Sequence, residues 1–112
     1  MSRRSKITHS PPAEVEDALK RLGQNIRIAR LRRRLRIQDV ADRIGTSRFT
    51  VADLERGKPS TSVAAYFGSL WALGLLDQVA PVGDPDLDEE GKILEHARLP
   101  TQARRRKTDR AS

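Results

Sequence analysis

Residues 37–57 of this 112-residue chain read IQDVADRIGTSRFTVADLERG, and their pattern decides the fold. Residues 39–44 have the spacing of a short amphipathic helix. Gly45 closes that helix, because a residue without a Cβ tolerates the left-handed conformation at a helix end. Ser47 is a favourable N-cap for another helix, which runs through Arg56 and stops at the next glycine. The segment therefore predicts two short helices joined by a tight turn.

Two further helical patterns flank this segment. Residues 14–34 contain no Pro and one Gly, with apolar side chains at three- and four-residue spacing. These side chains are Val15, Leu19, Leu22, Ile26 and Ala29. Residues 62–73 have a similar stripe, with Val63, Tyr66, Phe67, Leu70 and Leu73 on one face of the expected helix. Nothing in residues 14–74 alternates with period two, so the prediction is an all-α domain of four to five helices with disordered basic ends.

The charge is distributed unevenly along the chain. Residues 1–36 carry 11 basic and 3 acidic side chains, residues 59–96 carry 1 and 7, and the net charge is +7. We expect a disordered basic arm over residues 1–12, a helical domain over 13–80, an acidic turn and short helix over 81–99, and a disordered basic tail over 100–112. The basic excess indicates a polyanionic partner such as nucleic acid.

Several classes of function are disfavoured by composition. Cys is absent, which excludes disulfides, thiolate zinc sites and Cys nucleophiles. His9 and His96 have no clustered catalytic partners, and there is no Gly-rich phosphate loop, so we expect no enzyme, no metal and no cofactor. No apolar run approaches the roughly 20 residues that cross a bilayer, and the first residues do not resemble a secretion signal. We expect a cytoplasmic, nucleoid-associated protein without a membrane partner.

Two short helices joined by a tight turn form a helix-turn-helix, which presents its second helix to the DNA major groove. Over roughly residues 19–74 the chain resembles the Cro/CI-type, or XRE, helix-turn-helix regulators. The matching positions are Ile26, Arg30, Leu35, Ala41, Gly45, Ser47, Leu54, Glu55 and Gly57. The resemblance implies a partly buried, structural ion pair between Arg30 and Glu55.

The same resemblance places Arg48, Phe49, Thr50 and Asp53 at positions that touch base edges. Arg48 suits guanine O6 and N7, Phe49 suits a thymine methyl group, and Thr50 suits a base or a phosphate. Asp53 is either an acceptor for cytosine N4 or a solvated or Arg-paired carboxylate, and both alternatives stay open. Phosphate contacts are expected from Ser47, Arg56 and Lys58.

One departure from the family pattern lies at residues 36–38. Relatives begin this helix with Ser or Thr followed by Gln, whereas this chain has Arg36 and Ile37. Arg36 can reach a phosphate as a charge, but its side chain cannot cap the helix. Gln38 is the candidate substitute for the missing Gln contact, although it points about 100° away.

An excess of apolar residues follows the helix-turn-helix. We expect a homodimer surface formed by Tyr66, Leu70, Trp71, Leu75, Leu76 and Val79, with a larger core as the alternative. Residues 75–79 either continue as a helix or pair as a strand across the dimer. Residues 62–75 and the ending with Leu99 and Arg104–Arg106 are similar to HipB-like antitoxins. That similarity implies autorepression at a palindromic operator and a HipA-like serine/threonine kinase toxin as partner; a stand-alone regulator is the alternative.

Two other signals lead to weaker hypotheses. The arginine-rich run over residues 30–36 is compatible with RNA binding. Residues 84–95 partly match a calcium loop but lack its required Gly, so we prefer a short helix capped by Asp86 with Glu89 in its first turn. Its inward-facing residues would be Leu87, Leu94 and Ala97.

Overall fold

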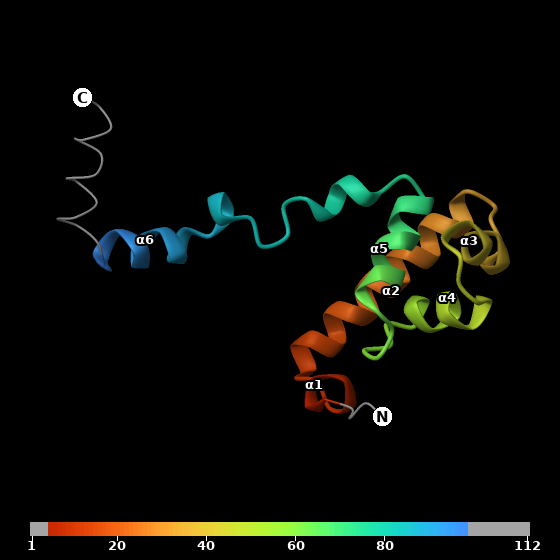
Figure 1. The fold of residues 1–112 in the computed structure, drawn as a ribbon, viewed down its shortest axis with the longest axis horizontal. Coiled ribbons are helices and arrows are strands. Elements are labelled where there is room, and N and C mark those ends of the chain that lie inside the picture. The colour runs from red at the N-terminus through yellow and green to blue at the C-terminus, as the bar shows by residue number, and fades with distance from the viewer. Residues whose placement is uncertain (1–4, 99–112) are drawn as a thin grey trace. The chain divides into compact units, whose positions relative to one another are not determined.

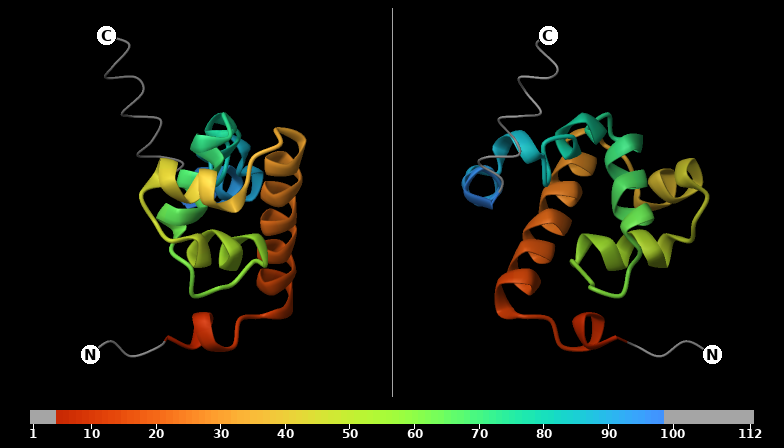
Figure 2. Two further views of the ribbon diagram at one scale, coloured as in Figure 1. Left: turned by 90° about the vertical axis from the view of Figure 1, so that its right-hand side faces the viewer. Right: turned by 60° about the vertical axis from the view of Figure 1, so that its left-hand side comes forward.

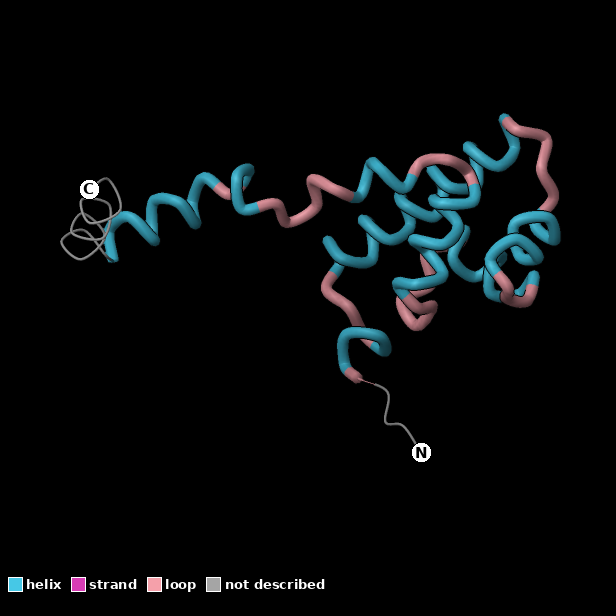
Figure 3. Tube along the Cα trace, turned by 45° about the horizontal axis from the view of Figure 1, so that its top comes forward, coloured by secondary structure: helices cyan, strands magenta, loops and turns pink. Residues whose placement is uncertain are grey.

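The computed structural model describes residues 5–98, and the elements in this range are all helical. They are α1 (Lys6–His9), α2 (Ala13–Arg32), α3 (Ile37–Ile44), α4 (Arg48–Glu55), α5 (Val63–Ala72), the 3-10 helices η1 (Leu76–Val79) and η2 (Pro85–Leu87), and α6 (Glu89–Arg98) (Figure 1). No strand occurs among these residues (Figure 3), which confirms the predicted all-α class. The open question at residues 75–79 is answered by the 3-10 helix η1.

The chain divides into two compact units, one ending at Gln78 and one beginning at Val79. In the first unit, α4 packs against α2, α3 and α5 (Figure 2). Its core is built from apolar side chains that are almost fully buried, namely Ile26, Val40, Ala41, Val51 and Leu54. Val51 and Leu54 lie one helical turn apart on α4, so one face of α4 is anchored in the core and the opposite face remains outside.

Both predicted ends of the central turn are confirmed. Gly45 adopts φ 75°, and its left-handed conformation ends α3. Ser47 caps α4 by accepting a hydrogen bond from the Thr50 backbone N–H. The turn between α3 and α4 therefore follows from local chemistry that the sequence shows directly.

A close helix crossing accompanies this turn. Gly23 on α2 is buried against α4, where a Cβ would overlap the carbonyl oxygen of Leu54. A Cβ on Gly57 would likewise overlap the backbone at Leu19. These glycines let the backbones of α2 and the end of α4 approach each other.

The predicted apolar stripe of α5 is only partly buried. Tyr66, Leu70 and, at the C-cap, Leu73 are buried together with Ala65 and Ser69. Val63 and Phe67, predicted on the same face, are 66% and 38% exposed. The reason is that α3 and α4 both pack on α5, and their position selects one of two adjacent apolar stripes.

The second unit corrects two predictions. Asp86 was expected to cap the helix that contains Glu89, but this helix, α6, begins at Glu89, and Asp88 accepts a hydrogen bond from the Gly91 N–H at its start. Asp86 lies inside η2, whose N-cap is Asp84. The three residues expected to face inward, Leu87, Leu94 and Ala97, are all exposed. Among the described elements, α6 contacts chiefly η2, which is too short to cover an apolar face.

Residues 1–12 were predicted as an arm without structure, but residues 6–9 form the single turn α1. The predictions for residues 1–4 and for the tail from residue 99 onward lie outside the described residues. Within residues 5–98, no helix has the length and apolar character needed to cross a membrane.

Candidate nucleic-acid interface

A buried ion pair holds α4 against α2. Arg30 Nε lies 2.6 Å from Glu55 Oε2, and Arg30 Nη2 donates to Glu55 Oε1 at 2.9 Å. Arg30 Nη1 also donates to the carbonyl oxygen of Leu35 at 2.9 Å, so the guanidinium joins three parts of the fold. The hydrogen bond to Glu55 raises the pKa of Arg30 above its ordinary value. Both side chains are committed to this pair, whose role is therefore to position α4.

The first turn of α4 displays two large side chains to solvent. Phe49 is 68% exposed, although an aromatic ring of this size is usually buried. The guanidinium of Arg48 lies over the Phe49 ring, 5.1 Å from its centroid. Among residues 5–98, no carboxylate forms an ion pair with Arg48. Arg48 is therefore exposed, and no carboxylate of residues 5–98 neutralises its charge.

Asp53 has cationic neighbours on its own segment. Its carboxylate pairs with Arg56, one turn further along, and lies 3.5 Å from Lys58 Nζ. Of the two alternatives left open by the sequence, this geometry favours the Arg-paired carboxylate. It also means that Arg56 and Lys58, expected at phosphates, share one acid between them.

The start of α3 has a side-chain cap that was not predicted from the sequence. The Asp39 carboxylate accepts the Arg36 backbone N–H at 2.7 Å, and Arg36 Nη2 donates to Asp39 Oδ1 at 2.9 Å. The hydrogen bonds from Arg36 lower the pKa of Asp39. The cap therefore comes from Asp39, the third residue of the helix, and not from the side chain of the N-cap residue Arg36. Next to it, Gln38 donates to Asp42 at 2.7 Å, which engages the residue proposed as a substitute contact.

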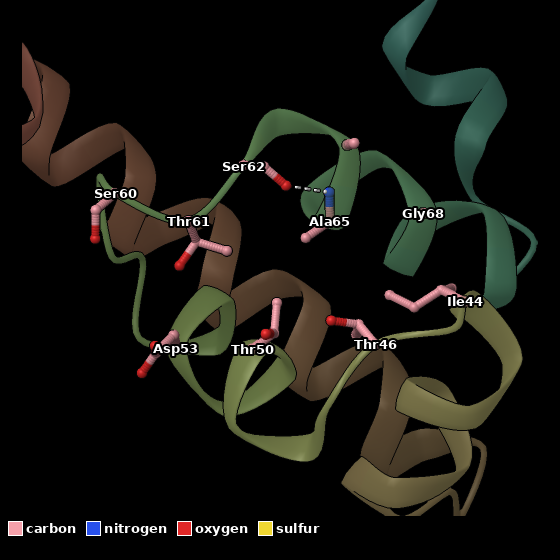
Figure 4. Close-up of a pocket in the computed structure, with 10 residues that line it drawn as sticks. Ile44, Thr46, Thr50, Asp53, Ser60, Thr61, Ser62, Ala65 and Gly68 are labelled. Atoms are coloured by element: carbon pink, nitrogen blue, oxygen red, sulfur yellow. Dashed lines mark hydrogen bonds between the residues drawn. The ribbon is translucent and has the colours of Figure 1, made fainter. Parts of the chain in front are cut away.

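Two depressions lie on either side of α4. One of about 520 Å³ lies at the start of α3 and α4 and is lined by Arg30, Arg36, Ile37, Gln38, Arg48, Phe49 and Ala52. The other, of about 500 Å³, lies between α4 and α5 and is rich in hydroxyl groups (Figure 4). Its polar side chains include Thr46, Thr50, Ser60 and Thr61, while the Ser62 hydroxyl caps α5 through the Ala65 N–H. Hydroxyl groups beside the exposed face of α4 are suited to donate hydrogen bonds to phosphate oxygens.

A third depression, of about 460 Å³, continues the basic surface along α2. Its polar lining includes Lys20, Gln24 and Arg27, none of which the sequence analysis proposed as contacts. Their spacing of four and three residues was a usable signal, because it places them on one face of the predicted helix.

The residues predicted to form a dimer surface separate into two groups. Tyr66 is buried and its hydroxyl donates to the Lys58 carbonyl oxygen at 2.9 Å, and Leu70 is buried as well. The prediction is wrong for Tyr66 and Leu70, because both side chains are buried in the core of the single chain. Burial and the nearby charge of Asp53 raise the pKa of Tyr66.

The other predicted dimer residues remain accessible. Trp71 is 51% exposed and packs under the guanidinium of Arg43, 5.4 Å from the ring centroid. Leu76 is exposed, and Leu75 and Val79 are half-buried. Val63 and Phe67, which precede Trp71 at four-residue intervals, are exposed too, so these three residues form an apolar row along one side of α5.

Comparison with known proteins agrees with this architecture. A family model described as a helix-turn-helix domain matches residues 21–87. No curated protein and no solved structure matches the chain. The matched range contains α3, the turn at Gly45, α4 and the α2 segment that carries the ion pair. Since the match extends over more than half of the sequence, the chain belongs to the helix-turn-helix domain family.

Proposed function

We propose that the protein is a sequence-specific transcriptional repressor of the XRE type, which inserts α4 into the major groove of double-stranded DNA. The observation that carries this proposal is the exposed Arg48 at the first turn of α4, which stacks on Phe49 and has no carboxylate partner among residues 5–98. The opposite face of α4 is held by the core and by the buried ion pair of Arg30 with Glu55. A rigidly held helix with an exposed Arg at its start fits bidentate recognition of guanine.

The surroundings of α4 support contacts to the DNA backbone. Arg36 and the α2 residues Lys20 and Arg27 extend the basic surface on one side. Ser47 and Thr50 provide hydroxyl groups at the α4 N-terminus, where backbone N–H groups also favour phosphate oxygens. Phosphate contacts of this kind set the orientation of the protein, while Arg48 and Phe49 contribute the sequence preference.

We further propose that the protein acts as a homodimer on a palindromic operator. The apolar row of Val63, Phe67 and Trp71, with the exposed Leu76 in the following η1, supports this, because exposed aromatic residues are enriched where protein surfaces meet. A two-fold dimer would present two copies of α4 to half-sites about one helical turn apart.

The test is selection of bound sequences from a random duplex pool, run beside a structured RNA that represents the arginine-rich alternative. We expect a palindromic duplex to be selected and to bind more tightly than the RNA. Replacing Arg48 with Ala should weaken binding by roughly 1–3 kcal/mol and relax the preference at one base position per half-site. Equal loss on every duplex would assign Arg48 to phosphate, and tighter RNA binding would replace the proposal.

A second candidate function is that of the antitoxin in a HipBA-like operon, with a HipA-like kinase toxin as partner. The observation that favours it is the second unit, where Leu87, Ile93 and Leu94 are exposed beside acidic side chains. Apolar residues without a core to join are suited to a protein partner. The test is co-purification of a neighbouring kinase-like gene product with the intact chain and with a chain ending at Val82. Equal retention by the shortened chain, or the absence of such a gene, would leave the stand-alone repressor.

A further inference from the structure

The depression at the start of α3 and α4 combines an apolar floor with a cationic rim. Ile37, Phe49 and Ala52 contribute the apolar surface. The cationic rim is defined by the lining residues Arg30, Arg36 and Arg48, with Gln38 beside them, and the Arg30 guanidinium itself is buried against Glu55. Ile37 is half-buried at the start of α3, and its side chain has no polar atom.

The rim charges differ in what they can still bind. Arg30 is held by Glu55, and Arg36 is paired with Asp39. Arg48 has no carboxylate partner among residues 5–98, and its guanidinium is oriented by the Phe49 ring. A ligand that fits this depression must therefore offer acceptors to Arg48 and an apolar group to the floor beside it.

A simple anion meets only half of this requirement, since Ile37, Phe49 and Ala52 have no polar side-chain atom to offer it. The major groove provides both halves in one place. Guanine presents O6 and N7 as paired acceptors, and a 5-methyl pyrimidine presents an apolar methyl group on the same edge of the duplex. When the pyrimidine directly precedes the guanine on one strand, its methyl group lies beside an Arg bound to that guanine. At about 520 Å³ the depression exceeds a methyl group and admits the edge of a base pair.

We propose that Ile37, Phe49 and Ala52 form a methyl pocket, which contacts the 5-methyl group of a pyrimidine immediately preceding the guanine bound by Arg48. The inference rests on the proposed DNA-binding function and specifies its target step. Thymine or 5-methylcytosine before guanine is favoured at this position, and cytosine or uracil is disfavoured. Ile37 and Phe49 are thereby specificity-determining residues.

The experiment uses the full chain and the tightest duplex from the random-pool selection. Each thymine is replaced singly by deoxyuridine, which removes only the 5-methyl group, and the dissociation constants are compared. We expect a loss of about 4-fold at one thymine per half-site, because burying one such carbon contributes about 0.8 kcal/mol. That thymine should precede a guanine, and 5-methylcytosine at the same position, with guanine opposite, should bind better than cytosine.

Variants then assign the methyl preference to the pocket. In Phe49→Ala and in Ile37→Gln, the ratio of the thymine to the deoxyuridine affinity should fall to about 1, whereas Phe49→Leu should retain it. Phe49 is largely exposed, so Phe49→Ala keeps the fold even if Ile37→Gln does not. Ile93→Ala, on the exposed face of α6, is the matched control and should keep the 4-fold ratio.

The outcomes separate this inference from the function on which it rests. A selected duplex that tolerates deoxyuridine at every thymine, or that contains no methylated pyrimidine before the critical guanine, overturns the methyl pocket while DNA binding stands. A ratio unchanged in Phe49→Ala also overturns it. Failure to select any duplex removes the proposed function itself, and the pocket with it.

Discussion

Arg30 and Glu55 meet across the α2–α4 interface with two nitrogen–oxygen contacts, at 2.6 and 2.9 Å, and both residues are only 7% exposed. The third guanidinium nitrogen reaches the Leu35 carbonyl, just before α3 begins. One side chain therefore sets the position of α4 relative to both α2 and the entry to α3. The orientation of the exposed Arg48 depends on this buried pair, because Arg48 and Glu55 lie on the same helix, α4.

Removing the acid from this pair should be strongly destabilising. Glu55→Gln leaves the Arg30 charge buried without a counter-ion, and we expect the free energy of unfolding to fall by about 3–5 kcal/mol. Urea denaturation followed by circular dichroism measures the change. The exposed pair of Arg36 and Asp39 is the control, since solvent screens an exposed pair and Asp39→Asn should cost much less than Glu55→Gln at neutral pH. A cost for Glu55→Gln as small as the control would contradict the structural role.

Two helix-interior glycines should respond in opposite directions to Ala. Gly23→Ala places a Cβ into the Leu54 carbonyl, so the helices must separate and we expect a loss of about 1–3 kcal/mol. Gly68→Ala meets only the Ile44 side chain at ordinary contact distances of 3.5 Å and more, so the helix propensity of Ala should stabilise α5 by about 0.5–1 kcal/mol. Thermal unfolding of the two variants measures both signs. Equal shifts would show that the crossing at Gly23 is not tight.

The cap of α3 predicts a pH dependence of stability. Hydrogen bonds from Arg36 lower the pKa of Asp39 below its ordinary value of 3.8. A depressed carboxyl pKa contributes stability above the unfolded pKa, and that contribution is lost as the pH falls through the folded pKa. The difference in stability between wild type and Asp39→Asn should therefore be present at pH 6 and shrink below about pH 4. Denaturation across this range measures it; a difference that is constant with pH argues against the cap.

The exposed apolar row predicts an effect on association without an effect on the monomer fold. Trp71→Ala removes an exposed ring that lies under the guanidinium of Arg43. We expect the dissociation constant of the proposed homodimer to increase roughly 30-fold, equivalent to about 2 kcal/mol. This is the size of effect seen for an aromatic residue at the centre of an interface. Sedimentation equilibrium measures the change. Leu70→Ala, in the core, should instead lower monomer stability by about 2–5 kcal/mol. Unchanged association in Trp71→Ala would move the interface elsewhere.

Features that depend on near neighbours in the chain are visible in the sequence. Gly45 ends α3 and Ser47 begins α4 as predicted, because these ends depend on a left-handed backbone and on a hydroxyl three residues from its donor. The helix-turn-helix arrangement and the outward placement of Arg48 and Phe49 follow from the same local spacing. The charge pattern is likewise a property of the chain alone.

Only the tertiary structure decided which apolar stripe of α5 is buried. Tyr66 and Phe67 are adjacent and similar in size, yet Tyr66 enters the core while Phe67 remains accessible. No local preference distinguishes them, since the choice depends on where α3 and α4 lie against α5. The close approach at Gly23 and the apolar floor next to Arg48 also require several helices to meet. The sequence by itself determined helices α2 to α5 and the turn between α3 and α4. Contacts between residues distant in the chain selected the buried faces and shaped the surface beside α4, because packing energy depends on the whole set of neighbours.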